Sequence, residues 1–261
     1  MAFSHHLLFL ALLLLFLPLS LSSSAGTIYS CKSNFTNNDA LQADIDRVVS
    51  DLVAGTQQNL YAKSAFGAVY GHAMCRGDVS QENCSTCMAE AAHMVRQDCH
   101  DSADSSIWSE NVYCFLHYGT SNFSGTANTT YVTGFRTSGT GNPAAFDVAA
   151  RQLMIWVNAM AVFSSNKFGT SFTMFESDQK IYGMALCTPD LSGSACEECL
   201  GVAMRTVVSM CAGFKGCAYI FQSCMVRYDT YVFTSNVATL PQCPFCEAAT
   251  TAASVPAPSG Q

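Results

Sequence analysis

Apolar and polar residues alternate along this chain with two different periods. In residues 39–53 the apolar side chains fall on one helical face, and residues 146–163 repeat that pattern with more apolar positions. Two further helices are expected at residues 84–99 and 196–211. Segments rich in Val, Ile, Tyr and Phe predict strands at residues 65–74, 131–135 and 180–186, and a closing pair of strands at each of residues 107–118 and 218–233. Because helices and strands mix without regular βαβ alternation, we expect an α+β fold with helices on one face of an antiparallel sheet.

The cysteines show that the chain contains an internal repeat. Cys75, Cys84, Cys87 and Cys99 recur 112 residues later as Cys187, Cys196, Cys199 and Cys211. The Tyr-Gly-x-Ala-x-Cys run before the first of them recurs as well, and so does an aspartate, Asp78 and Asp190, which we expect to cap a turn or helix. A period this long indicates two domains rather than a solenoid. We place them at residues 26–124 and 131–242, with a polar linker at 125–130 and a tail at 243–261.

Composition and charge narrow the class of protein. With 49 % apolar and 12 % charged residues the chain is not disordered, and a net charge of −7 argues against nucleic-acid binding. Fourteen cysteines are too many for a typical cytosolic protein, so disulfides are expected. An apolar run at residues 7–21 followed by small residues predicts a signal peptide at 1–25, although a buried core helix is the alternative. No later stretch predicts a membrane span or a lipid-anchor signal.

The cysteine spacing carries a family resemblance. The motif Cys75-x8-Cys84-x2-Cys87, repeated from Cys187, resembles the signature of the plant ginkbilobin-like domain, also called the salt-stress-response/antifungal domain. Two copies behind a signal peptide resemble the cysteine-rich repeat secretory proteins and the ectodomains of plasmodesmata-located proteins. The resemblance implies that each domain consists of two helices packed on a five-stranded antiparallel sheet.

The same resemblance implies a set of disulfides. It pairs Cys31 with Cys99, Cys75 with Cys84, Cys87 with Cys114, Cys187 with Cys196, and Cys199 with Cys224. In the second domain Ser138 occupies the position of Cys31, so Cys211 lacks its usual partner. Three additional cysteines can replace that partner, namely Cys217, Cys243 and Cys246. The alternative is that some of these thiols stay free or pair between chains.

The family also implies mannose binding through an Asn, an Arg and a Glu. The matching positions here are Lys32, Trp108 and Gly119 in the first domain, and Gly139, Ala218 and Asp229 in the second. The triad is therefore not retained, which argues against a simple mannose lectin. Lys32, Trp108 and Asp229 remain candidate ligand contacts, Trp108 because an exposed indole can stack on a sugar ring or a partner, although a half-buried Trp in the core is the alternative. Asn34, Asn122 and Asn128 are the expected glycosylation sites, whereas Asn83 adjoins a disulfide cysteine and is disfavoured.

Two other interpretations of the cysteines, a redox dithiol and a zinc site, are weaker than their interpretation as structural disulfides. Cys243-Pro-Phe-Cys246 has the spacing of a redox dithiol but precedes a Pro/Ser/Ala tail, and the two Cys-x2-Cys pairs suit zinc only if they are not oxidised. The sequence contains none of the usual catalytic motifs, and His72 and His117 are expected to be structural. We therefore expect no enzyme activity, cofactor or metal.

The sequence as a whole indicates a secreted, non-enzymatic binding protein of the plant apoplast in defence or stress response. The family implies antifungal activity or carbohydrate binding, and the expected partner is a cell-wall or fungal glycan or a protein at the cell surface. One alternative is a cell-surface or plasmodesmal signalling component without its membrane anchor. The other is a thiol-disulfide oxidoreductase that uses Cys243 and Cys246.

Overall fold

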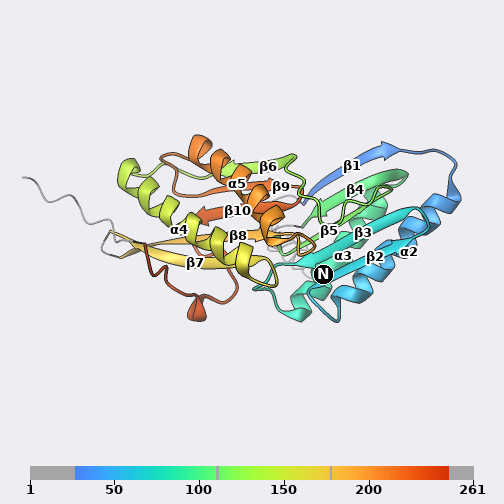
Figure 1. Cartoon of the computed structure of the whole chain (residues 1–261), viewed down its shortest axis with the longest axis horizontal. Coiled ribbons are helices and arrows are strands. Elements are labelled where there is room, and N and C mark those ends of the chain that lie inside the picture. Colours follow the sequence, from blue (N-terminus) through green and yellow to red (C-terminus); the bar gives the residue numbers. More distant parts are fainter. Residues whose placement is uncertain (1–26, 110–111, 177, 247–261) are drawn as a thin grey trace, which may run out of the picture.

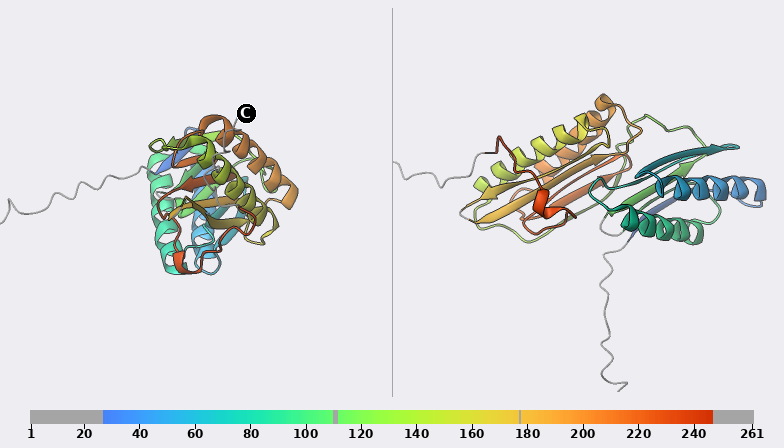
Figure 2. Two further views of the ribbon diagram at one scale, coloured as in Figure 1. Left: turned by 90° about the vertical axis from the view of Figure 1, so that its left-hand side faces the viewer. Right: turned by 90° about the horizontal axis from the view of Figure 1, so that it is seen from below.

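The fold was analysed in a computed structural model that describes residues 27–109, 112–176 and 178–246. The predicted signal peptide lies outside these residues, as does the tail beyond residue 246. Figure 1 shows two units, each made of a sheet with a pair of helices on one face. The two helix pairs lie on opposite sides of the molecule, with the sheets between them (Figure 2, right).

Each unit contains a five-stranded antiparallel sheet and two helices, which confirms the predicted fold class. In both sheets the first strand along the chain is an edge strand, and the third and fourth helices repeat the positions of the first two. The first sheet has the order β1-β4-β5-β3-β2 and the second β6-β9-β10-β8-β7. The first unit comprises β1 (Ile28–Asn34), α2 (Asp39–Thr56), β2 (Tyr61–Phe66), β3 (Val69–Cys75), α3 (Gln81–Asp98), β4 (Ser102–Trp108) and β5 (Cys114–Gly119). The second comprises β6 (Tyr131–Arg136), α4 (Pro143–Phe163), β7 (Phe168–Phe175), β8 (Gln179–Cys187), α5 (Gly193–Met210), β9 (Cys217–Phe221) and β10 (Cys224–Asp229), followed by the 3-10 turn η2 (Val237–Thr239).

Local sequence explains where the helices begin. The Ser80 and Ser192 hydroxyls accept hydrogen bonds from the backbone N–H groups of Asn83 (3.2 Å) and Ala195 (3.1 Å), so the second helix of each unit has the same N-cap. α4 begins with Pro143 at its first turn, where the missing N–H costs nothing. The aspartates Asp78 and Asp190 do not cap these helices, because the serines do.

The strands of the structure differ from the predicted ones in several places, and β1 and β7 were not predicted at all. Residues 65–74 are not one strand but part of the β2–β3 hairpin, which turns at Gly67 with a φ of 55°. β4 was missed because its sequence is rich in Ser and Asp, which resembles a loop. Its serines are nevertheless buried, with Ser105 0 % exposed, because β4 lies inside the sheet between β1 and β5.

Seven disulfides connect these elements and use all 14 cysteines. The structure joins the five pairs that the resemblance implies: Cys31–Cys99, Cys75–Cys84, Cys87–Cys114, Cys187–Cys196 and Cys199–Cys224. Of the alternatives for Cys211, it joins Cys217, six residues away, which leaves Cys243 with Cys246. The covalent tie between the first strand and the second helix therefore exists only in the first unit.

Hydrogen bonds hold the corresponding segment of the second unit. The Thr137 N–H donates to the Gly216 carbonyl (2.8 Å), and the Lys215 N–H donates to the Ser138 carbonyl (2.9 Å). The Arg136 guanidinium donates to the Met210 carbonyl at the end of α5 (3.1 Å). The Cys211–Cys217 disulfide closes the loop that contains the Gly216 carbonyl and the Lys215 N–H, so it fixes the surface on which the chain after β6 is held.

A third apolar cluster joins the two units. Each sheet is covered by helices on one face, and its other face contributes large apolar side chains to a shared core between the units. Trp108 and Phe115 stack there with ring centroids 4.1 Å apart. The buried members of this cluster are Met74, Trp108, Val112 and Phe115 from the first unit and Met184, Leu186, Ala218, Ile220 and Met225 from the second. Because both sheets bury apolar surface in one cluster, we infer that the units form a single body.

The two disulfides that differ between the units should stabilise the protein unequally. Cys31–Cys99 joins residues 68 positions apart, and Cys211–Cys217 joins residues 6 apart. Chain-entropy reasoning assigns about 4 kcal/mol to the first crosslink and about 2 kcal/mol to the second. We expect the double Cys→Ser variant at Cys31 and Cys99 to lose about twice as much stability in urea as the variant at Cys211 and Cys217. Equal losses would contradict this entropic account.

Candidate functional site

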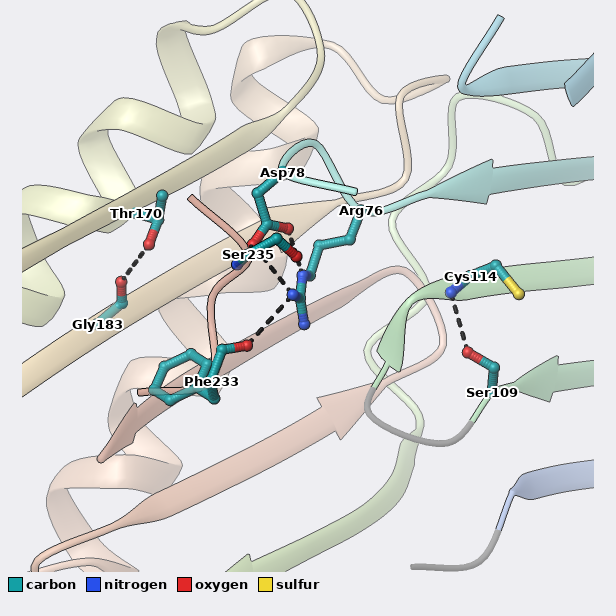
Figure 3. A network of polar contacts seen from close by, with 8 residues as sticks. All are labelled: Arg76, Asp78, Ser109, Cys114, Thr170, Gly183, Phe233 and Ser235. Carbon is teal, nitrogen blue, oxygen red and sulfur yellow. Dashed lines mark hydrogen bonds and ion pairs between the residues drawn. The ribbon is translucent and has the colours of Figure 1, made fainter. Parts of the chain in front are cut away.

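A buried ion pair after β3 connects the first unit to the second. Arg76 and Asp78 form a bidentate pair, with Nη2 3.0 Å from Oδ2, and their side chains are only 1 % and 4 % exposed. Both also bind backbone of the second unit, since Arg76 Nη2 donates to the Phe233 carbonyl (3.2 Å) and Asp78 Oδ2 accepts from the Ser235 N–H (2.7 Å) (Figure 3). The pair therefore fixes residues 233–235 against the first unit.

The repeated aspartate of the second unit makes the reciprocal contact. Asp190 Oδ2 accepts from the Gly125 N–H (2.7 Å), and Oδ1 lies 3.3 Å from Nδ1 of His72 in β3. Both side chains are almost fully buried. The prediction that these two aspartates cap a turn or helix is thus wrong, because each of them reaches beyond its own unit. Their recurrence after the repeated cysteine was the signal, but the sequence pattern did not show what they contact.

The electrostatics of this contact favour a neutral histidine. Burial lowers the pKa of His72 more than Asp190 raises it. Burial raises the pKa of Asp190, but the His72 ring and the Gly125 N–H outweigh that effect, so the pKa lies below its ordinary value. His117 and Lys63 also face His72 and further lower its pKa. At neutral pH the contact therefore joins an uncharged imidazole to a carboxylate.

A pocket of about 260 Å³, which we call the junction pocket, lies beside the Arg76–Asp78 ion pair. Tyr113 of the first unit lines it together with Arg227 and residues 231–235 of the second. The Arg227 guanidinium lies 4.1 Å from the centroid of the Phe233 ring and 5.4 Å from that of Tyr231. These distances are typical of cation–π contacts, so the aromatic rings stabilise a cation that is largely removed from water.

The polar groups of Arg227 are only partly used. Its Nη2 donates to the Tyr231 hydroxyl, and the nearest carboxylate oxygen, Asp229 Oδ2, is 3.8 Å away. Arg227 Nε and Asp229 Oδ2 have no hydrogen-bond partner in the described part of the chain. Burial lowers the pKa of Arg227 and raises that of Asp229. The wall of the pocket thus combines aromatic faces with an incompletely paired cation, and the Asp229 carboxylate lies buried behind Arg227.

Comparisons with known proteins place the chain in a family. A family model described as salt stress response/antifungal matches residues 30–121 and 133–231. The chain belongs to this family. The match confirms the resemblance seen in the cysteine spacing, and each copy of the family domain contains one complete sheet and its two helices.

The relatives of this chain within the family include a secretory protein, an antimicrobial protein and a receptor-like protein. The chain is 30 % identical to cysteine-rich repeat secretory protein 55 of Arabidopsis thaliana over 81 % of its own length and 84 % of the relative. It is 33 % identical to an antimicrobial ginkbilobin-2-like protein of Castanea crenata, over 62 % of this chain and 67 % of that one. The tandem DUF26 ectodomain of the Arabidopsis thaliana receptor-like protein PDLP8 superposes with a TM-score of 0.67 at 22 % identity, covering 78 % of this chain and 97 % of that one.

The structure separates the three candidate ligand residues of the family domains. Lys32 is exposed on the edge strand β1, opposite Asp104 of β4 in the backbone register of the sheet. Trp108 is only 1 % exposed and belongs to the core between the units, so its indole is not available to stack on a sugar. Asp229 is 1 % exposed and lies beside Arg227. Only Asp229 lies next to the junction pocket, and sequence reasoning missed Arg227 there.

The remaining candidate residues occupy different parts of the family fold. Asn34, Asn122 and Asn128 are exposed, and the amide oxygens of the last two accept from the backbone N–H groups of Ser124 and Thr130. Cys243 is 4 % exposed in the core of the second domain, and its N–H donates to the Phe172 carbonyl (2.8 Å).

Within the described ranges no group of three or more His, Cys, Asp or Glu side chains is arranged to hold a metal ion. α4 is long and apolar enough to cross a membrane, but it packs on the second sheet.

The buried Arg76–Asp78 pair should matter far more than a surface pair. Arg76→Gln leaves Asp78 buried without its counter-ion, so we expect a loss of about 3–5 kcal/mol in unfolding free energy measured with urea. The control is Arg47→Gln, which removes an exposed pair with Asp51 on α2 and should cost less than about 1 kcal/mol. Similar losses in the two variants would show that the junction pair does not hold the units together.

His72 should make the stability of the protein sensitive to mild acid. A histidine with a folded pKa below its unfolded value of about 6.5 contributes stability that is present above that pH and is lost as the pH falls through the folded pKa. We expect the urea midpoint to fall between about pH 6.5 and 5, and to fall less in His72→Gln. Asp190 adds a loss only below about pH 4. The exposed His93→Gln variant should keep the wild-type profile, and a flat wild-type profile would contradict the assignment.

Proposed function

We propose that this protein is an extracellular, non-enzymatic binding protein of the apoplast that acts in defence or stress response by recognising a glycan. Its relatives include a cysteine-rich repeat secretory protein and a protein named as antimicrobial. The observation that carries the proposal is the junction pocket, in which Arg227, Tyr231 and Tyr113 come together from both domains.

The chemistry of the pocket suits a sugar residue. Sugars offer hydroxyl groups to charged donors and C–H faces to aromatic rings, and this pocket presents an arginine and three aromatic side chains. Its volume of about 260 Å³ lies below the roughly 300–1,000 Å³ of sites for drug-sized ligands, which favours a single sugar unit at the end of a cell-wall or fungal glycan. Because the Arg76–Asp78 pair fixes residues 233–235, the pocket wall is preorganised.

A binding role is favoured over thiol-disulfide exchange by the state of the cysteines. All 14 are oxidised, and Cys243, the first cysteine of the candidate dithiol, is buried in a domain core. Exchange requires an accessible sulfur, so burial argues for a structural role of this pair. The exposed Asn34, Asn122 and Asn128 are proposed glycan acceptors, and carbohydrate there would cover part of the first domain and the linker.

A second candidate function is that of a cell-surface or plasmodesmal signalling component. It is favoured by the fold shared with the ectodomain of a receptor-like protein. The chain spans only 33 % of the cysteine-rich receptor-like protein kinase 25 of Arabidopsis thaliana, to which it is 29 % identical. Co-purification of the secreted protein with receptor ectodomains, and not with cell-wall polysaccharide, would support this function over glycan recognition.

The glycan proposal can be tested on an array of plant and fungal cell-wall sugars, followed by calorimetry with the best binder. We expect Arg227→Met to weaken binding at least about tenfold, as loss of a charged hydrogen-bonding group does. Tyr231→Ala, at a side chain that is already half exposed, should weaken binding without loss of folding. The matched control is Arg205→Met on the exposed surface of α5. Absence of glycan binding, or equal binding by Arg227→Met and the control, would refute the proposal.

A further inference from the structure

The helix layer of the second domain contains an apolar groove that the junction pocket does not explain. α4 and α5 run over the same face of the second sheet (Figure 1), and a hollow of about 500 Å³ lies between them. Ile155, Val162 and Phe163 line it from α4, and Gly193, Glu197 and Gly201 from α5. Ile155 is 58 % exposed and Phe163 is 87 % exposed, so large apolar side chains stand open to solvent along this groove.

The internal repeat shows that this apolar character is specific to the second domain. The buried faces of α2 and α4 match at a separation of 105 residues, which pairs Val48 with Leu153 and Leu52 with Val157. At the same separation Ile155, Val162 and Phe163 correspond to Ser50, Gln57 and Gln58. The fold therefore accepts polar residues at all three positions, and the core does not require apolar ones there.

The first domain bridges its helices with polar contacts that the second domain lacks. Arg96 of α3 donates to the Ser50 hydroxyl (2.9 Å) and to the Asp46 carbonyl (3.3 Å) of α2. The residue that corresponds to Arg96 at the 112-residue period is Val208. Val208 cannot make these hydrogen bonds, so Ile155, which stands in the position of Ser50, lacks the polar partner that Ser50 has.

Small residues on α5 make the groove deep. Gly193 and Gly201 stand where the first domain has Gln81 and Ala89. A Cβ atom on Gly193 would lie 3.7 Å from the Val162 carbonyl, so a side chain there would occupy the space over that end of α4. The absence of side chains on these two glycines leaves room for an occupant along α5.

Charge identifies the kind of occupant. Among the residues that line the groove, Glu197 is the only ionisable one, and it stands where the first domain has Ser85. An apolar groove with one carboxylate complements a ligand that has an apolar chain and one positive charge. A hollow of about 500 Å³ is also within the range of small-molecule sites.

We propose that the α4–α5 groove binds a cationic amphiphile, a single aliphatic chain that carries an ammonium group, with Glu197 as the counter-ion. The aliphatic chain of the ligand lies against Ile155, Val162 and Phe163 and over Gly193 and Gly201. The site is on the outer helix layer of the second domain and is separate from the junction pocket, so a ligand can occupy either one alone.

The proposal is tested by titrating the purified protein with three probes of equal chain length below their micelle concentrations: dodecylamine, dodecanol and dodecanoate. Binding is followed by displacement of the neutral dye Nile red and by calorimetry. We expect dodecylamine to bind about fivefold more tightly than dodecanol, the ratio that an ion pair of about 1 kcal/mol gives, and dodecanoate to bind most weakly. Equal affinities for the three probes would overturn the assignment of Glu197.

Variants of the protein separate the contribution of the probe's aliphatic chain to binding from that of its ammonium charge. Glu197→Gln should remove the preference for dodecylamine over dodecanol and leave dodecanol binding unchanged. Ile155→Ser, Val162→Gln and Phe163→Gln, which introduce the residues of the first domain, should together abolish binding of all three probes, and Ile155→Ser alone should weaken it if the triple variant is unstable. The control is Val148→Ser, at an exposed apolar residue of α4 outside the groove.

Two outcomes would overturn the proposal. Undiminished probe binding in the variants with polar groove residues would place the probes elsewhere. A protein that forms a dimer by light scattering, and becomes a monomer in the triple variant, would show that a second copy of the chain covers the groove instead of a small molecule.

Discussion

The structure depends on the burial of two sheet faces against each other. A sheet with helices on one face only leaves a second face that must be buried elsewhere, and in this protein each domain supplies the cover for the other. The shared cluster around Trp108 and Phe115 gives an apolar contact to which both sheets contribute. The tandem arrangement is therefore a requirement of packing as well as a consequence of duplication.

The polar contacts of the junction acquire their strength from that apolar cluster. Arg76, Asp78, His72 and Asp190 are excluded from water at the junction, where an ion pair or hydrogen bond is worth more than on the surface and where an unpaired group is costly. They fix the second domain relative to the first by binding specific backbone groups. The same arrangement places Tyr113 beside Arg227 and forms a pocket that neither domain has alone.

The two copies have diverged in ways that conserve the core and change the surface. The long crosslink between Cys31 and Cys99 is replaced in the second copy by a short one and by backbone hydrogen bonds, and the strand order of the sheet is unchanged. The helix layer changed from polar in α2 to apolar in α4 at matched exposed positions. Surface residues can change in this way because the buried face of the helix determines its packing.

The sequence by itself determined the fold class, the helices and the duplication. The helical periodicity of α2 and α4 and the repeated cysteines are local or periodic features, so they can be read without coordinates. β4 was not readable, because its serines are buried only when neighbouring strands cover them. Tertiary structure alone decided that Cys211 pairs with Cys217, that Trp108 is in a core and not on a surface, and that Asp78 and Asp190 act between domains. Each of these depends on which side chains the folded backbone brings within a few ångströms of one another, and periodicity does not contain that information.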